Sequence, residues 1–155
     1  MDQTDKEILK CLLQNARMPA SLISKQVNLS VSAVLERIRK LENTGVIQQY
    51  TVQIDPKKIG KDLVAFISVS LDHPRYNDDF VARIKKDRRI TECHYITGDF
   101  DFLLKVMTHS TESLEATLRT IKNIPGVSLT RTLVVFSTLK QEVTVIFDDD
   151  PQQMQ

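Results

Sequence analysis

The sequence predicts an α+β protein with two domains, a helical N-terminal domain and a C-terminal domain of four strands and two helices. Three observations support this prediction. Apolar residues recur at helical spacing up to Gly45. From Leu63 onward, alternating strand patterns and two amphipathic helical patterns follow one another in the order βαββαβ. A stretch rich in turn residues separates the two patterns. The predicted limits are 1–54 for the helical domain, 55–62 for a linker, 63–147 for the second domain and 148–155 for a flexible acidic tail.

The bulk composition is that of an ordinary globular protein. The chain has 155 residues, of which 41% are hydrophobic and 26% are charged, and this length permits two small domains. No apolar run is long enough to cross a membrane, so we expect no membrane association. The N-terminal residues MDQTDKEI are polar and acidic, unlike a signal or transit peptide. We therefore expect a cytoplasmic protein.

The cysteines and histidines give no sign of a metal, a disulfide or a catalytic site. Cys11 and Cys93 lie in apolar segments without CxxC spacing, and we expect two buried free thiols. His73, His94 and His109 are far apart in sequence, which favours ordinary surface or half-buried histidines. We predict no metal, no cofactor and no catalytic residues.

Charge is spread unevenly between the two halves. The whole chain carries +1, which is low for a protein that neutralises DNA phosphates. Residues 1–62 hold ten Lys and Arg against seven Asp and Glu, a net +3, and the remainder carries −2. The asymmetry has the sign expected for nucleic-acid binding by the first domain, but it is modest.

The first two predicted helices lie on either side of Pro19. Thr4 followed by Glu7 is a capping-box pattern, and it predicts a first helix from Asp5 to about Gln14. Pro19 suits the first turn of the second helix, because its missing N–H would be unpaired there. Asn28 follows at the tight turn, where a left-handed residue is usually needed.

The third predicted helix carries the candidate DNA contacts. Its apolar stripe is Val34, Ile38 and Leu41, at positions i, i+4 and i+7. Small residues at its start would let the backbone approach DNA, and basic residues further along would reach phosphates or guanine edges. An ordinary solvated helix face is the alternative. The candidate DNA-binding residues, of which Ser30 or Ser32 also caps the helix, are Ser30, Ser32, Ala33, Glu36, Arg37, Arg39 and Lys40.

The remaining elements form the linker and the second domain. VIQQYTVQI after Gly45 predicts a strand, and Asp55-Pro56 to Gly60 a turn. In the second domain we expect both helices on one face of a four-stranded antiparallel ferredoxin-like sheet, the first helix capped by Asn77. LKQEVTVIF extends the last strand or forms another. Because apolar residues also occur on the other face, a partner sheet from a second subunit is its natural cover.

With these elements in order, the chain resembles the Lrp/AsnC (feast/famine) family of transcriptional regulators over nearly its whole length. No single motif is specific, but their order and spacing together are. The residues that carry the resemblance are Asp5 with Ile8-Leu9, Asn15-Ala16-Arg17, Leu29-Ser30, Val34, Arg37-Ile38, Leu41-Glu42, Gly45-Val46-Ile47, Tyr50, Asp55-Pro56 with Gly60, Gly98-Asp99-Phe100-Asp101, Ile124-Pro125-Gly126-Val127 and Thr130-Arg131-Thr132.

The resemblance implies a winged-type helix-turn-helix followed by a RAM domain, the regulatory domain of amino-acid metabolism. It also implies a homodimer that assembles to an octamer, and an amino acid or related metabolite as effector. Gly98 and Asp101 match the family's ligand loop, where a carboxylate can pair with an α-ammonium group. Asp99 is a weaker candidate on the same loop, and Ser137 and Thr138 are candidate hydroxyl contacts. A simple acidic hairpin turn is the alternative for this loop.

Three departures from the family pattern concern Ala16, Asn28 and Glu36. Ala16 and Asn28 stand where glycine is common, and Glu36 stands where many relatives are basic. A carboxylate at Glu36 would repel phosphate but could accept a hydrogen bond from cytosine N4, which puts the usual operator preference in doubt.

Two other functions remain open. A tetrapyrrole (sirohaem) decarboxylase of similar architecture would need converging histidines, and Arg88-Arg89 and Arg131 are the only obvious carboxylate-binding clusters. An oligomerisation scaffold with a degenerate helix-turn-helix is the third possibility.

Overall fold

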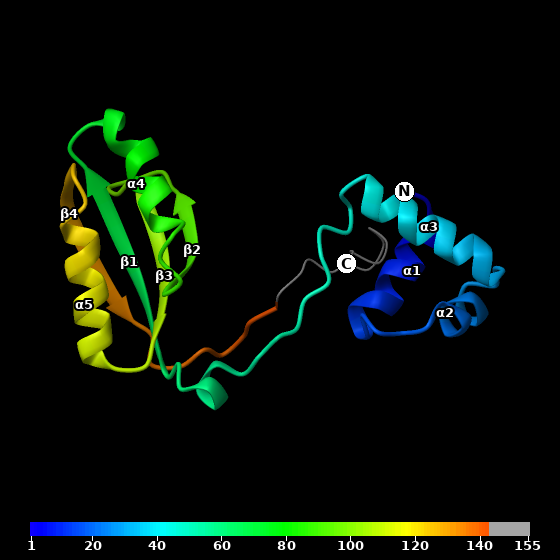
Figure 1. Ribbon diagram of the computed structural model, residues 1–155. Coiled ribbons are helices and arrows are strands. Elements are labelled where there is room, and N and C mark those ends of the chain that lie inside the picture. The colour runs from blue at the N-terminus through cyan, green and yellow to red at the C-terminus, as the bar shows by residue number, and fades with distance from the viewer. Residues whose placement is uncertain (143–155) are drawn as a thin grey trace, which may run out of the picture. The chain divides into compact units, whose positions relative to one another are not determined.

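The computed structural model describes residues 1–142, which divide into two compact units. One unit holds Met1–Gln53 and the other holds Ile54–Gln141 (Figure 1). Among the described residues no helix combines the length and apolar character needed to cross a membrane. Each unit has its own hydrophobic core, and each is described by itself.

Three helices make up the first unit. They are α1 (Gln3–Gln14), α2 (Ala20–Gln26) and α3 (Val31–Asn43). Their apolar stripes meet in one small core, in which Ile8, Ile23 and Val34 are fully buried. The stripe predicted for α3 is confirmed, since Val34 and Leu41 are buried and Ile38 packs against the same core.

Helix α1 begins two residues earlier than predicted, because Asp2 and not Thr4 caps it. The capping box joins Asp2 and Asp5: the Asp5 amide donates to Asp2 Oδ1 at 2.8 Å, and the Asp2 amide donates to Asp5 Oδ2 at 3.0 Å. Thr4 and Glu7 lie inside the helix. Asp accepts these amide hydrogen bonds as well as Ser or Thr does, so the earlier cap displaces the predicted one.

The turn between α2 and α3 is as expected. Asn28 has φ +55°, the left-handed conformation that asparagine tolerates better than most residues. The Ser30 hydroxyl accepts a hydrogen bond from the Ala33 amide at 3.2 Å and caps α3. Gly45 follows the helix with φ +72°.

The strand predicted for residues 46–54 is not formed. These residues have no regular secondary structure, and the alternating side chains Val46, Val52 and Ile54 are exposed. An extended segment becomes a strand only when another strand pairs with it, and the described residues supply none. Tyr50 instead donates a hydrogen bond to Glu42 Oε1 at 2.9 Å, which joins the segment to α3. Partial burial and the Glu42 carboxylate raise the pKa of Tyr50 to about 12.

The second unit begins with a short 3-10 turn and continues into the predicted βαββαβ order. The turn η1 (Pro56–Ile59) is capped by Asp55 and ends at Gly60, as expected from the sequence. The other elements are β1 (Leu63–Leu71), η2 (Pro74–Tyr76), α4 (Asn77–Ile84), β2 (Ile90–Tyr95), β3 (Phe102–Thr108), α5 (Thr111–Lys122) and β4 (Val127–Val134).

The four strands form one antiparallel sheet in the order β2-β3-β1-β4, with both helices on one face (Figure 1). This is the ferredoxin-like plan predicted from the sequence. Cross-strand partners such as Ile67 and Leu104 point to the helical face and are fully buried. The helices add Phe80, Ile84 and Ile121 to the same core.

No element within residues 1–142 covers the opposite face of the sheet. Phe66 pairs with Lys105 on one side and with Leu133 on the other, so all three project to this face. Leu129 and Leu133 on β4 are more than half exposed, at 56% and 54%. The sheet therefore presents an apolar surface at its β4 side.

Two local predictions in this unit are wrong. Asn77 is the first residue of α4 and not its cap, because η2 runs directly into the helix. Cys93 is exposed on β2, a strand at the sheet edge, whereas Cys11 is buried as expected. Strand β4 ends at Val134, and residues 135–142 have no regular structure. Most of the LKQEVTVIF segment and the tail predicted for 148–155 lie outside the described residues.

Candidate nucleic-acid interface and effector loop

The outward side of α3 is the candidate surface for DNA. Ser32, Glu36, Arg39 and Lys40 are all exposed, on the side of the helix opposite to buried Val34. In the described part of the chain neither basic side chain of this group has an ion-pair partner. Their charges are therefore available to an external anion.

The start of the helix is built for close approach. Ser30 caps α3, and its hydroxyl also lies 3.0 Å from the Ser32 hydroxyl. Ala33 is half-buried and has only a methyl side chain, so it adds little bulk. The first turn thus offers free amides and small side chains, as an anion or base edge would require.

Arg37, which the sequence predicts to be a DNA contact, is half-buried and ion-paired within the first unit. Its Nη1 donates to Asp2 Oδ2 at 2.6 Å and to Asp5 Oδ1 at 2.8 Å. Asp5 is buried, with 5% of the residue exposed, and its carboxylate also belongs to the cap of α1. The hydrogen bonds from the Asp2 amide and from Arg37 hold the pKa of Asp5 below its usual value. Arg37 thus forms ion pairs that join α3 to the start of α1.

The position of Arg37 on α3 is a sequence signal for this ion pair, although the sequence analysis predicts a DNA contact there. Arg37 lies on the flank of the apolar stripe and not opposite to it, and a charged residue there is directed toward a neighbouring helix. Asp2 lies in the polar N-terminal segment and Asp5 at the predicted start of the first helix, and neither position by itself indicates a partner on α3. Only the packing of α1 on α3 brings the three side chains together.

The candidate effector loop connects β2 to β3. Gly98 has φ +112°, which non-glycine residues rarely adopt, and no other atom lies within 4 Å of where a Cβ would be. Asp101 attaches the loop to the end of β1 through both its backbone and its side chain. Its amide donates to the Val69 carbonyl at 3.0 Å, and its Oδ2 accepts from the Leu71 amide at 2.8 Å.

Asp101 therefore has a structural task as well as a candidate binding role. One carboxylate oxygen pairs with the chain, and the other has no hydrogen bond from the described residues. Asp99 is exposed, and its carbonyl accepts from the Ser70 hydroxyl at 3.3 Å. Gly98, Asp99 and Asp101 are thus gathered at one end of the sheet.

Ser137 and Thr138 do not join this loop within one chain. Both are exposed and follow β4 beyond Val134, which pairs with Ala65. The loop lies near Leu71, six residues further along β1, or roughly 20 Å at about 3.3 Å per residue. A site that contains both groups would need a second subunit.

The histidines do not converge on a cleft. His73 precedes α4, His94 lies on β2 and His109 precedes α5. Within residues 1–142 there is no group of three or more His, Cys, Asp or Glu side chains that could hold a metal ion.

Both halves of the chain match known protein families. Residues 1–48 match the winged helix-turn-helix DNA-binding family model, and residues 64–145 match the Lrp/AsnC ligand binding domain. The HTH-type transcriptional regulator FL11 of Pyrococcus horikoshii is 38% identical over 91% of this chain and 93% of its own. The leucine-responsive regulatory protein of Salmonella typhimurium is 37% identical over 91% of this chain and 88% of its own.

A solved structure gives the same result. A transcriptional regulator from Neisseria meningitidis, crystallised as a complex with L-Met, superimposes with a TM-score of 0.88 at 29% identity, covering 94% of this chain and 96% of that one. These matches are to regulators and not to enzymes, which removes the tetrapyrrole decarboxylase as an alternative. The chain belongs to the Lrp/AsnC family of DNA-binding transcriptional regulators.

Proposed function

We propose that this protein is a cytoplasmic, homo-oligomeric regulator that reads a specific DNA sequence with α3 and responds to an amino acid at the β2–β3 loop. The observation that carries the DNA assignment is the exposed, unpaired polar side of α3 opposite a buried stripe. Ser30, Ser32 and Ala33 would lie closest to the groove. Glu36, Arg39 and Lys40 would contact bases or phosphates.

Arg37 has a different part in this proposal. Because its guanidinium is bound to two carboxylates, it sets the position of α3 and does not itself approach DNA. Glu36 has no counter-ion within residues 1–142, and its carboxylate would accept from cytosine N4.

The DNA assignment is tested by removing single charges from α3. Lys40→Ala and Arg39→Ala should each weaken binding to an operator fragment. For a phosphate contact, the slope of log affinity against log salt should fall by about 0.9. Lys122→Ala removes the same charge from α5 in the other unit, and it serves as the matched control. Operator affinity is measured by fluorescence anisotropy at several salt concentrations. Equal affinities for wild type and both α3 variants would reject the assignment.

The effector assignment rests on the geometry of the loop and on the Neisseria meningitidis relative crystallised with L-Met. A positive-φ glycine, a free carboxylate oxygen on Asp101 and the exposed Asp99 are the groups that would face an α-ammonium. Ser137 and Thr138 would come from a neighbouring subunit. A thermal-shift screen of the twenty amino acids, starting with L-methionine and L-leucine, tests this, since a ligand of the folded state raises the melting temperature. No shift with any of them would count against the site.

The uncovered apolar face of the sheet supports the proposed assembly. A dimer formed through this face would bury Phe66, Leu129 and Leu133 and would present two copies of α3 to a two-fold symmetric operator. Four such dimers would make the octamer that the family resemblance implies. Effector and DNA would then be coupled through the same assembly equilibrium, typically by about 1–3 kcal/mol.

A further inference from the structure

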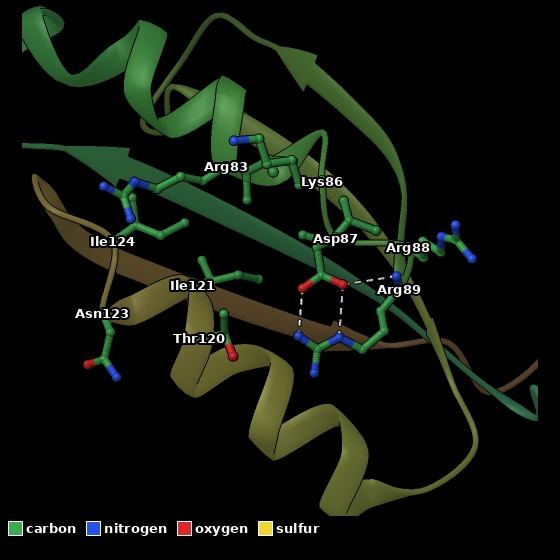
Figure 2. A pocket seen from close by; sticks show the side chains of 11 residues that line it. Arg83, Lys86, Asp87, Arg88, Arg89, Thr120, Ile121, Asn123 and Ile124 are labelled. Carbon is green, nitrogen blue, oxygen red and sulfur yellow. Dashed lines mark hydrogen bonds and ion pairs between the residues drawn. The ribbon is translucent and has the colours of Figure 1, made fainter.

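A basic cavity lies on the helical side of the sheet, in the groove between α4 and α5. It runs from Arg88 and Arg89, beside the start of β2, to Asn123 and Ile124 after α5 (Figure 2). Its volume is about 640 Å³, within the usual range of about 300–1,000 Å³ for small-molecule sites. The effector loop follows Tyr95, at the far end of β2, so Arg88 and Arg89 are separated from it by the length of that strand.

Positive charge is concentrated at this cavity. The segment 83–89 reads RIKKDRR, five basic residues and one acidic residue, in a half of the chain whose net charge is −2. Four of the five basic residues line the cavity: Arg83, Lys86, Arg88 and Arg89. Together with Asp87 they give it a net charge of +3, which would attract an anion.

The cations are not needed to satisfy the ends of the two helices. At the end of α4, the amides of Lys85, Lys86 and Asp87 already donate to helix carbonyls. At the end of α5, the amides of Asn123 and Ile124 do the same. Cations near a helix C-terminus are favourable in general, but that interaction does not require four of them around one cavity.

The arginine side chains are also held in place. Asp87 binds Arg89 as a fork, with Nε to Oδ1 at 2.9 Å and Nη2 to Oδ2 at 2.6 Å, and Figure 2 shows this pair between α4 and α5. Arg83 is joined to Asp79 through Nε alone, at 2.7 Å, which leaves its other nitrogens available. Lys86 has no ion-pair partner within residues 1–142. Preorganised guanidinium groups are suited to anions with several oxygens.

We propose that this cavity is a binding site for phosphate groups, distinct from the amino-acid loop. Arg83, Lys86 and Arg89 would contact the phosphate oxygens, and the exposed amide of Asn123 lines the α5 side. The phosphates could belong to a soluble phosphorylated compound or to the DNA backbone, since the chemistry of recognition is the same. The inference does not depend on which amino acid, if any, binds the β2–β3 loop.

The test compares two neighbouring lysines in the full-length protein. Lys86 lines the cavity, whereas Lys85 is exposed and does not line it. Lys86→Ala and Lys85→Ala therefore remove the same charge, one inside the site and one beside it. Sodium pyrophosphate is titrated into each protein by calorimetry at constant ionic strength. The proposal expects saturable binding to wild type, at least about tenfold weaker in Lys86→Ala and unchanged in Lys85→Ala.

A second arm identifies the source of the phosphate. Affinity for a DNA duplex is measured for the same three proteins. Binding of pyrophosphate with equal DNA affinities assigns the site to a soluble compound. Loss of DNA affinity in Lys86→Ala alone, without pyrophosphate binding, assigns it to the DNA backbone. Equal losses of binding in Lys86→Ala and Lys85→Ala would show that only the general positive charge of the segment matters. No change in either variant would show that Lys86 binds no phosphate. Either result would overturn the proposed site.

Discussion

Asp101 allows the two roles of one carboxylate to be separated by experiment. Its Oδ2 accepts a hydrogen bond from the Leu71 amide at 2.8 Å, while its other oxygen is available to an effector. Asp101→Ala removes both interactions. Asp101→Asn keeps an amide oxygen that can accept from the Leu71 amide but removes the negative charge that an α-ammonium group needs.

The magnitudes follow from these contacts. A hydrogen bond to a charged group contributes about 1.5–3 kcal/mol, and the lower value suits a side chain that is only half-buried. Asp101→Ala should therefore lower the free energy of unfolding by about 1.5 kcal/mol, or the midpoint by roughly 6–12 °C for a unit of this size. Asp101→Asn should keep near wild-type stability and still lose about tenfold or more in affinity for the effector.

The assay pairs calorimetric unfolding with titration of the amino acid found in the thermal-shift screen, at fixed protein concentration because assembly also raises stability. Asp78→Asn makes the same charge change at an exposed position in the first turn of α4, outside the loop, and is the control. Wild-type effector affinity in Asp101→Asn would refute the ammonium pairing. Wild-type stability in Asp101→Ala would refute the structural role of the hydrogen bond.

Three further predictions concern the rest of the fold. Arg37→Met should make the first unit unfold at a higher pH on acidification. The pKa of Asp5 is lowered in the folded state, so the stability that ionised Asp5 contributes is complete above the ordinary carboxyl pKa and disappears as the pH falls toward the lowered value. Circular dichroism against pH measures this, and an unchanged acid transition would contradict it. Leu133→Asp places a charge on the uncovered face and should give a folded monomer in analytical ultracentrifugation, whereas an unchanged assembly would exclude that face. Gly126→Ala puts a Cβ 2.3 Å from the Tyr76 ring and holds alanine at φ +87°, so it should destabilise the second unit by about 1–3 kcal/mol in urea unfolding. Wild-type stability would contradict both the steric conflict and the backbone strain.

The order of the elements could be predicted from the sequence because its causes are local. The stripe of Val34, Ile38 and Leu41, the cap at Ser30 and the left-handed Asn28 each depend on residues within one or two turns of the chain. The alternation from Leu63 to Leu71 likewise marks one face of a strand without reference to its neighbours. The family resemblance rests on the same ordered signals.

Two kinds of prediction failed. The caps of α1 and α4 were wrong by a few residues within one turn, whereas the strand at 46–54 and the role of Arg37 depend on a second segment of the chain. Residues 46–54 have strand-like alternation, but a strand needs a partner, and the described chain provides none. The outward basic residues of α3 could likewise be predicted from the sequence. That Arg37 is bound to Asp2 and Asp5 could not, because the packing of α1 on α3 brings them together.

The candidate sites divide in the same way. Gly98 and Asp101 are recognisable as a loop motif from the sequence alone. The contact of Asp101 with Leu71, the distance of Ser137 and Thr138 from that loop, and the cavity between α4 and α5 were decided by the tertiary structure. Periodicity and capping are local properties that the sequence determines, whereas strand register and helix packing bring together side chains far apart in the chain, and these contacts determine which charges are left free to bind a ligand.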